Sequence, residues 1–104
     1  MRKTQIEWAA GALANLDQIE QFIARDNPTA AANTVIRIID RVEKELSLFP
    51  SAGRPGRVDG TREIVFPDLP YIVVYTVRRS TVFIIRVFHT SQDFQRLAHS
   101  ITPN

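Results

Sequence analysis

Helical periodicity dominates the first half of the chain. Apolar residues recur every three or four positions from Ala9 to about Arg25, and this spacing predicts an amphipathic helix. Before it, Thr4–Glu7 alternates apolar and polar positions, which predicts the start of a short strand with Ile6 and Trp8 on one face.

A second helix is the clearest element in the sequence. Asn27 is expected to cap it and Pro28 to occupy its first turn. Its apolar stripe comprises Ala31, Val35, Ile38, Ile39, Val42 and Leu46. Ala32 and Ile36 widen the apolar arc to about 160°, more than one packed neighbour needs. This width has two interpretations: burial between the first helix and a sheet, or contact with a partner. The short link predicts that both helices form an antiparallel hairpin.

The second half of the chain reads as β-structure. Phe49–Arg57 is predicted to be a loop because it holds two prolines, two glycines and two arginines. Strands are predicted over Arg62–Phe66, Tyr71–Val77 and Thr81–Phe88, and the middle one is apolar on both faces, as expected of a central strand. A short helix is possible around Gln92–Ala98.

These elements predict an α+β fold. A short edge strand is followed by the antiparallel two-helix hairpin and then by a three-stranded antiparallel meander, on which the helices lie. A length of 104 residues with 44% hydrophobic residues is suited to a single domain spanning residues 1–104.

Composition excludes several classes of chemistry. The chain has no cysteine, which removes disulfides, zinc–thiolate sites and thiol nucleophiles. Two histidines and scattered acids have no metal-binding spacing, so neither a metal nor a cofactor is expected. Apolar runs are too short for a membrane-spanning helix, and no apolar segment follows Met1–Lys3 as in a signal peptide. A cytoplasmic protein without membrane contact is therefore expected.

Positive charge is concentrated in the second half of the chain. Residues 51–104 carry seven arginines against four acids, a net charge of +3, whereas the first half carries six basic and seven acidic residues. Arginine suits bidentate contact with phosphate or carboxylate. Arg54 and Arg57 in the predicted loop, and Arg78 and Arg79 at the predicted hairpin tip, are therefore candidates for binding a target. The tip arginines have a simpler interpretation as a solvated turn.

His89 is the one candidate for acid–base chemistry. It closes the last predicted strand, and with Arg62 and Arg86 it is the combination that metal-free RNA cleavage requires. Arg86 and His89 are three residues apart, so in an unbroken strand they point to opposite faces. The alternative, which we favour, is that His89 bonds Asp93 or a loop carbonyl and holds the chain end.

The ordered motifs of the chain resemble the RelE/ParE superfamily of bacterial toxins. The matching segments are Asn27–Ala31 between the helices, Phe49–Arg57, Gly60–Glu63, Pro70–Tyr75 and Arg86–His89. The resemblance implies the helical hairpin on an antiparallel sheet, and the toxin half of a type II toxin–antitoxin pair. ParE-like members poison DNA gyrase, and RelE-like members cut mRNA on the ribosome.

One position in the central strand bears on the choice of target. RelE-like nucleases usually carry an arginine after the aromatic residue that opens the central strand, where this chain has Ile72 after Tyr71. The resemblance therefore favours gyrase, with the ribosome and its mRNA as the alternative target. His89, Arg62 and Arg86 are catalytic only under the nuclease interpretation. A binding module that has lost its toxicity is a third possibility.

The resemblance also implies a cognate antitoxin. Such antitoxins have a C-terminal segment that is disordered alone and folds on the toxin. The contacts expected here are Trp8 and, on the wide arc of the second helix, Ala32, Ile36 and Ile39.

Overall fold

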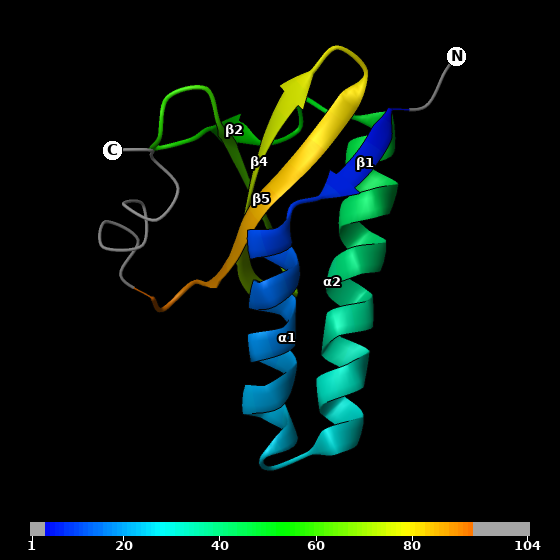
Figure 1. Ribbon diagram of the computed structural model, residues 1–104, viewed down its shortest axis with the longest axis vertical. Coiled ribbons are helices and arrows are strands. Elements are labelled where there is room, and N and C mark those ends of the chain that lie inside the picture. The colour runs from blue at the N-terminus through cyan, green and yellow to red at the C-terminus, as the bar shows by residue number, and fades with distance from the viewer. Residues whose placement is uncertain (1–3, 93–104) are drawn as a thin grey trace.

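Two helices cover one face of a five-stranded mixed sheet (Figure 1). A computed structural model describes residues 4–92 of the chain. In chain order the elements are β1 (Gln5–Trp8), α1 (Ala10–Ala24), α2 (Pro28–Leu48), β2 (Arg54–Pro55), β3 (Arg62–Phe66), β4 (Leu69–Arg78) and β5 (Thr81–His89). The α+β architecture predicted from the sequence is confirmed.

The predicted meander forms the centre of the sheet. The strand order is β1-β5-β4-β3-β2, and β4 pairs antiparallel with β3 on one side and with β5 on the other. β1 is the expected edge strand and lies parallel to β5, with Ile6 opposite Val82. A parallel pair needs a long connection, and here the helical hairpin and the strands β2, β3 and β4 lie between β1 and β5 in the chain.

The helices form the predicted antiparallel hairpin. The Asn27 side chain accepts a hydrogen bond from the Ala30 amide at 3.0 Å, and Pro28 begins α2, as the sequence indicates. In α2 the buried residues are Ala31, Ile38, Val42 and Leu46. The last three pack in one core with Leu16 of α1 and with Tyr75 and Ile84 of the sheet. Figure 1 places the α1–α2 turn at the end of the molecule opposite the β4–β5 hairpin tip.

Two sequence predictions need correction. The segment predicted as loop contains β2, where Arg54 and Pro55 pair with Glu63 and Arg62. β4 begins at Leu69, two residues earlier than predicted, because Phe66 pairs with Leu69 across a two-residue turn. In the sequence analysis a proline ends a predicted strand. Proline has no N–H group, but it is tolerated in a strand at a position where no N–H is needed for pairing. The helix predicted around Gln92–Ala98 lies, apart from Gln92, outside the described residues.

A bulge interrupts β5 where β1 ends. Val74 pairs with Arg86 and Tyr75 with Ile84, so Ile85 is the extra residue. Beyond this point no strand formed by residues 4–92 lies on the outer side of β5. There the Asn15 side chain of α1 accepts the hydrogen bond of the Val87 amide at 2.9 Å. The helix therefore protects the strand edge that β1 leaves uncovered.

An exposed ion-pair cluster links α2 to the β3–β4 turn. The Asp68 carboxylate accepts hydrogen bonds from Arg37 at 2.8 Å and Arg41 at 2.5 Å. The hydrogen bond from Arg41 is the main cause that lowers the pKa of Asp68 below its usual value. A carboxyl group whose pKa is lower in the folded state stabilises the fold above its unfolded-state pKa.

We therefore expect Asp68→Asn to lower the urea midpoint at pH 7. The difference from the unmodified protein should shrink as the pH falls through the folded-state pKa of Asp68, because the protonated carboxyl group no longer forms the ion pairs. Asp40→Asn, which removes one exposed pair with Lys44 at 3.3 Å, is the matched control and should have the smaller effect at pH 7. A difference that persists unchanged at pH 2 would contradict this account.

Candidate functional site

The segment before β3 is fastened to the sheet on its helix-facing side. The Tyr75 hydroxyl accepts a hydrogen bond from the Gly53 amide at 2.8 Å and donates one to the Pro50 carbonyl oxygen at 2.9 Å. The Arg62 guanidinium donates to the carbonyl oxygens of Gly53 at 2.7 Å and Ser51 at 3.4 Å. Arg62 and Tyr75 are register partners, so one row of the sheet holds residues 50–53.

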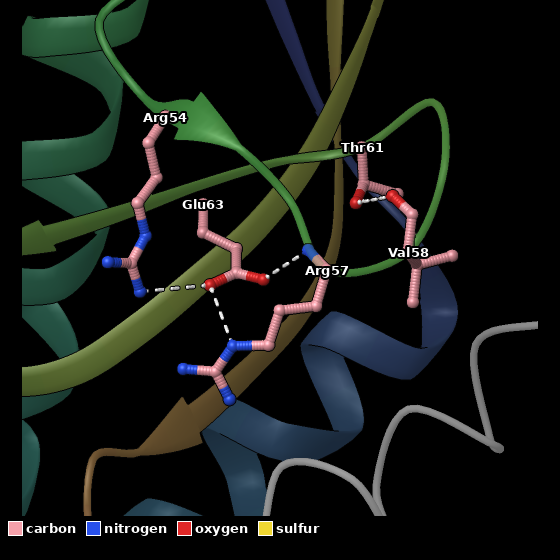
Figure 2. A network of polar contacts seen from close by, with 5 residues as sticks. All are labelled: Arg54, Arg57, Val58, Thr61 and Glu63. Carbon is pink, nitrogen blue, oxygen red and sulfur yellow. Dashed lines mark hydrogen bonds and ion pairs between the residues drawn. The ribbon is translucent and has the colours of Figure 1, made fainter.

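The next residue of β3 holds the same segment from the other side of the sheet. Glu63 is 2% exposed, and its carboxylate accepts a hydrogen bond from the Arg57 amide at 2.9 Å. The Arg54 guanidinium lies 3.3 Å from this carboxylate and the Arg57 Nε 3.8 Å. Figure 2 shows both arginine side chains directed toward the Glu63 carboxylate, one from β2 and one from the loop that follows.

The loop between the two arginines and Glu63 is itself tightly bonded. The Gly56 amide donates a hydrogen bond to the Thr61 carbonyl oxygen at 2.7 Å. The Thr61 hydroxyl donates one to the Val58 carbonyl oxygen at 2.6 Å, and Figure 2 draws this second bond. Gly60 closes the turn with a φ of 82°, a conformation that favours glycine. Arg54 and Arg57 are therefore presented by an ordered scaffold, although their side chains are 62% and 51% exposed.

Burial changes the acidity of Tyr75. Desolvation raises the pKa of its hydroxyl above 10.0, and the Gly53 hydrogen bond and the charge of Arg62 oppose this shift. The hydroxyl is therefore protonated at neutral pH and acts as both donor and acceptor in holding the loop.

Glu63 is the residue that sequence reasoning missed. A signal for it was present, because β4 is apolar on both faces and β3 was predicted beside it. A carboxylate alternating with Arg62 on such a strand faces a covered surface and needs cationic partners. Arg62 itself alternates to the other face, and the arginines that precede it in the sequence, Arg54 and Arg57, supply these partners.

The three candidate catalytic residues are not gathered at one place. Arg62 is bound to the loop carbonyls on the helix-facing side. Arg86 donates to its neighbouring Ile85 carbonyl oxygen at 2.8 Å, and its guanidinium lies so close to Gly11 of α1 that a methyl group there would overlap it. In register, Arg86 pairs with Val74 and His89 with Tyr71, so the two leave the sheet in the opposite directions expected from their spacing.

His89 lines a cavity of about 460 Å³ between α1 and the sheet. Its ring meets the Tyr71 ring edge-on with centroids 5.4 Å apart, and its Nδ1 lies 2.7 Å from the Ser91 hydroxyl. Other walls are formed by Ile19 and Phe22 of α1. Asp93, the predicted partner of His89, lies outside the described residues, so the arrangement seen is a hydrogen bond to a neighbouring serine.

The arginines at the β4–β5 hairpin tip differ from Arg54 and Arg57 in their surroundings. Arg78 and Arg79 are exposed and form no ion pair with any residue between 4 and 92. Arg79 has a φ of 56°, which is costly for a residue other than glycine. The tip therefore presents two cations to solvent on a turn that would favour glycine.

The residues expected to contact an antitoxin divide into two groups. Ile36 is 61% exposed and Ala32 is also exposed on α2. Trp8 and Ile39 pack against the core, and the Trp8 ring N–H donates to the Glu43 carboxylate at 3.3 Å. The wide apolar arc of α2 is thus partly buried against the core and partly left on the surface.

The described part of the chain has neither a metal site nor a membrane-spanning helix. Within residues 4–92, no group of three histidine or acidic side chains is placed to hold a metal ion. Neither helix of this part of the chain is long and apolar enough to cross a membrane.

Comparison with known proteins identifies the class. Residues 6–94 match the model of the family described as ParE toxin of type II toxin-antitoxin system, parDE. Over 97 residues the chain is 41% identical to Y4kP of Sinorhizobium fredii, which carries a toxin name, covering 93% of this chain and 99% of Y4kP. It is 30% identical over 88 residues to toxin RelE2 of Caulobacter vibrioides, covering 85% and 97%.

A solved structure agrees with this assignment. A chain of the chromosomal ParDE toxin–antitoxin system of P. aeruginosa superposes with a TM-score of 0.74 at 27% identity, over 84% of this chain and 96% of that one. The protein is therefore a toxin of a type II toxin–antitoxin system. It belongs to the ParE toxin family, within the RelE/ParE superfamily.

Proposed function

We propose that the protein arrests bacterial growth by inhibiting DNA gyrase and thus replication, and that a cognate antitoxin neutralises it. The observation that carries this proposal is the dispersal of Arg62, Arg86 and His89 described above. Metal-free cleavage of RNA requires an acid–base group and cations around one phosphate. These three side chains lie on different strands or faces and are engaged in holding the fold.

The central strand supports the same proposal. Ile72 stands where RelE-like nucleases usually carry an arginine, and it is buried at 7% exposure, paired with Val65 and Phe88. An apolar residue at that place supplies no charge to a transition state. The family match and the ParDE structure favour the same target.

A ribosome-dependent mRNA endonuclease is the second candidate. The observation in its favour is the 30% identity with a relative named RelE2. Under this interpretation His89 is the acid–base residue and its replacement abolishes activity.

One pair of assays separates the two candidates. Purified toxin is added to a gyrase supercoiling and DNA-cleavage assay, and in parallel to translating ribosomes analysed by toe-printing. We expect inhibition of supercoiling with accumulation of cleaved DNA. We expect His89→Ala to retain this inhibition within about threefold, because within residues 4–92 the His89 ring forms hydrogen bonds with Ser91 alone. Ribosome-dependent mRNA cuts that disappear in His89→Ala would overturn the proposal. Arg62→Ala is unsuitable here, since it also releases the loop carbonyls.

The exposed hairpin tip is the proposed contact with the target. Arg79 stands at a positive φ where glycine would be less costly, which is expected if its guanidinium group, beside that of Arg78, is used in binding. Replacing Arg79 by glycine in the same supercoiling assay tests this contact, with unchanged inhibition counting against it.

A surface of α2 is the proposed contact with the antitoxin. Ala32 and Ile36 expose apolar area that a folded antitoxin segment could cover. Hydrogen exchange of α2 in the presence and absence of the antitoxin tests this contact, and exchange that is unchanged around Ile36 would refute it.

A further inference from the structure

A row of apolar side chains crosses β3, β4 and β5 on the face of the sheet opposite the helices. Register pairing joins Val65, Ile72 and Phe88 in this row. Tyr71 and Val73, the neighbours of Ile72 along β4, belong to the core beneath the helices. Because side chains alternate along a strand, Ile72 and its partners lie on the other side of the sheet. We call these three residues the outer row.

Two members of the outer row are buried, although both helices lie on the opposite face (Figure 1). Ile72 is 7% exposed and Phe88 is 3% exposed. Phe88 is moreover at the margin of the sheet, because β1 ends at Trp8, opposite Ile84. The face of an antiparallel sheet that carries no helix is commonly solvated. The burial of Ile72 and Phe88 therefore requires another segment of protein over β4 and β5.

The loop after β2 does not account for this burial. It is attached over β3, where the Arg57 amide donates to the Glu63 carboxylate. Val65, the member of the outer row on β3, is 45% exposed, so burial along the row increases from β3 to β5. A cover supplied by the loop would produce the opposite gradient. The covering segment therefore approaches from the β5 side.

The chain itself continues from that side of the sheet. At the end of β5 the Gln92 amide donates to the His89 carbonyl oxygen at 3.0 Å, which closes a turn. The Thr90 amide donates to the Pro70 carbonyl oxygen at 2.9 Å and holds this turn beside the start of β4. Residues 93–104 thus begin next to the end of the sheet at which Ile72 and its partner in β5 lie.

The sequence of residues 93–104 is suited to an apolar surface. Its apolar side chains have the spacing of one helix face and are Phe94, Leu97, Ala98 and Ile101. As a helix, residues 94–101 would be about 10 Å long. Strands in a sheet are about 4.8 Å apart, so this length is enough to cover β5 and β4.

We propose that residues 93–104 pack on the outer face of the sheet, with Phe94 and Leu97 against Phe88 and Ile72. The segment is then a third layer of the fold, and the toxin domain is not complete at Gln92. A short turn joins it to β5, so the entropy lost in closing this contact is small. The inference goes beyond the proposed function and is independent of whether gyrase or the ribosome is the target.

The test is urea unfolding of the full-length toxin, followed by the fluorescence of Trp8. Phe94→Ala and Leu97→Ala should each lower the urea midpoint by about 0.5–1.5 M, because each removes a large apolar side chain from a buried contact. Gln95→Ala is the matched control, since it lies in the same segment but off the apolar stripe. It should change the midpoint by less than about 0.3 M.

Double-mutant cycles identify the surface that the segment covers. Leu97→Ala is combined with an alanine substitution of one isoleucine on each of three surfaces. Ile72 lies in the outer row, Ile38 in the core beneath the helices and Ile23 in the wall of the cavity beside α1. The midpoint shift of Leu97→Ala should be non-additive with Ile72→Ala and additive with the other two. Isoleucine-to-valine substitutions replace any alanine variant that does not fold.

Three results would overturn the proposal. The first is an effect of Phe94→Ala and Leu97→Ala no larger than that of Gln95→Ala. The second is coupling of Leu97 to Ile23 instead of Ile72, which would place the segment in the cavity. The third is a urea midpoint that rises with protein concentration while the Phe94 and Leu97 variants behave like the control, which would assign the cover to a second copy of the chain. All are measured without gyrase, ribosomes or antitoxin, so failure of this inference is distinguishable from failure of the proposed function.

Discussion

Gly53→Ala should lower the free energy of unfolding by about 2–4 kcal/mol. A Cβ atom on Gly53 would lie 2.6 Å from the Tyr75 hydroxyl oxygen and 2.8 Å from the carbonyl oxygen of Glu63. The second of these belongs to the backbone of β3, which is paired on both sides and cannot give way cheaply. Relieving the overlap would move Gly53 away from Tyr75 and break the buried hydrogen bond of its amide.

Gly60→Ala is the matched control for this substitution. Gly60 has a φ of 82° and no atom within 4 Å of an added Cβ, so its replacement introduces backbone strain without any overlap. Its expected cost is about 1 kcal/mol. Urea titrations followed by the fluorescence of Trp8 measure both changes. If Gly53→Ala costs no more than Gly60→Ala, close contact with Tyr75 and Glu63 is not the reason for glycine at position 53.

Tyr75→Phe should lower the free energy of unfolding by about 1–3 kcal/mol. The substitution keeps the buried ring but leaves the Gly53 amide and the Pro50 carbonyl without the hydroxyl that joins them. Tyr71→Phe is the control, since the Tyr71 hydroxyl forms no hydrogen bond with the described residues and its ring contact with His89 is retained. An equal cost for the two variants would contradict a special role for the Tyr75 hydroxyl.

The effect of Tyr75→Phe should depend on pH in the alkaline range. Burial raises the pKa of Tyr75 in the folded state above its unfolded value near 10.0. The unfolded chain therefore releases this proton first, and the contribution of Tyr75, fully present below pH 10, decreases as the pH rises through the folded-state pKa. The stability difference between the unmodified protein and Tyr75→Phe should shrink above pH 10, and urea midpoints measured from pH 8 to 11 test this.

Much of the fold follows from local pattern. The period of the apolar residues in α2, the capping side chain of Asn27 and the β-branched residues of β4 and β5 are local properties, and each element lies within two residues of its expected position. β2 could not be found in this way, because a two-residue strand has no periodicity and exists only where β3 offers its edge. Ile85 was likewise not foreseeable as a bulge, since pairing partners determine it.

The candidate site was less predictable than the fold. Residue type made Arg54, Arg57, Arg62 and Arg86 candidates. It shows which groups a side chain can bind, but not whether that side chain already binds other groups of the same protein. The structure engages Arg62 with loop carbonyls and aligns Arg54 and Arg57 with Glu63. Arg78 and Arg79 were predicted to lie at a solvated hairpin tip, and in the structure both are exposed at the β4–β5 turn.

The sequence by itself determined the helical hairpin, the three central strands and the toxin superfamily, because periodicity, capping and ordered motifs depend on neighbours along the chain. Only the tertiary structure decided that β1 lies parallel to β5 and that adjacent residues of β3 hold one loop from opposite faces of the sheet. The physical reason is the alternation of side chains along a strand. Because of it, Arg62 and Glu63 lie on different faces of the sheet. The role of each side chain then depends on which residues the fold places on that face.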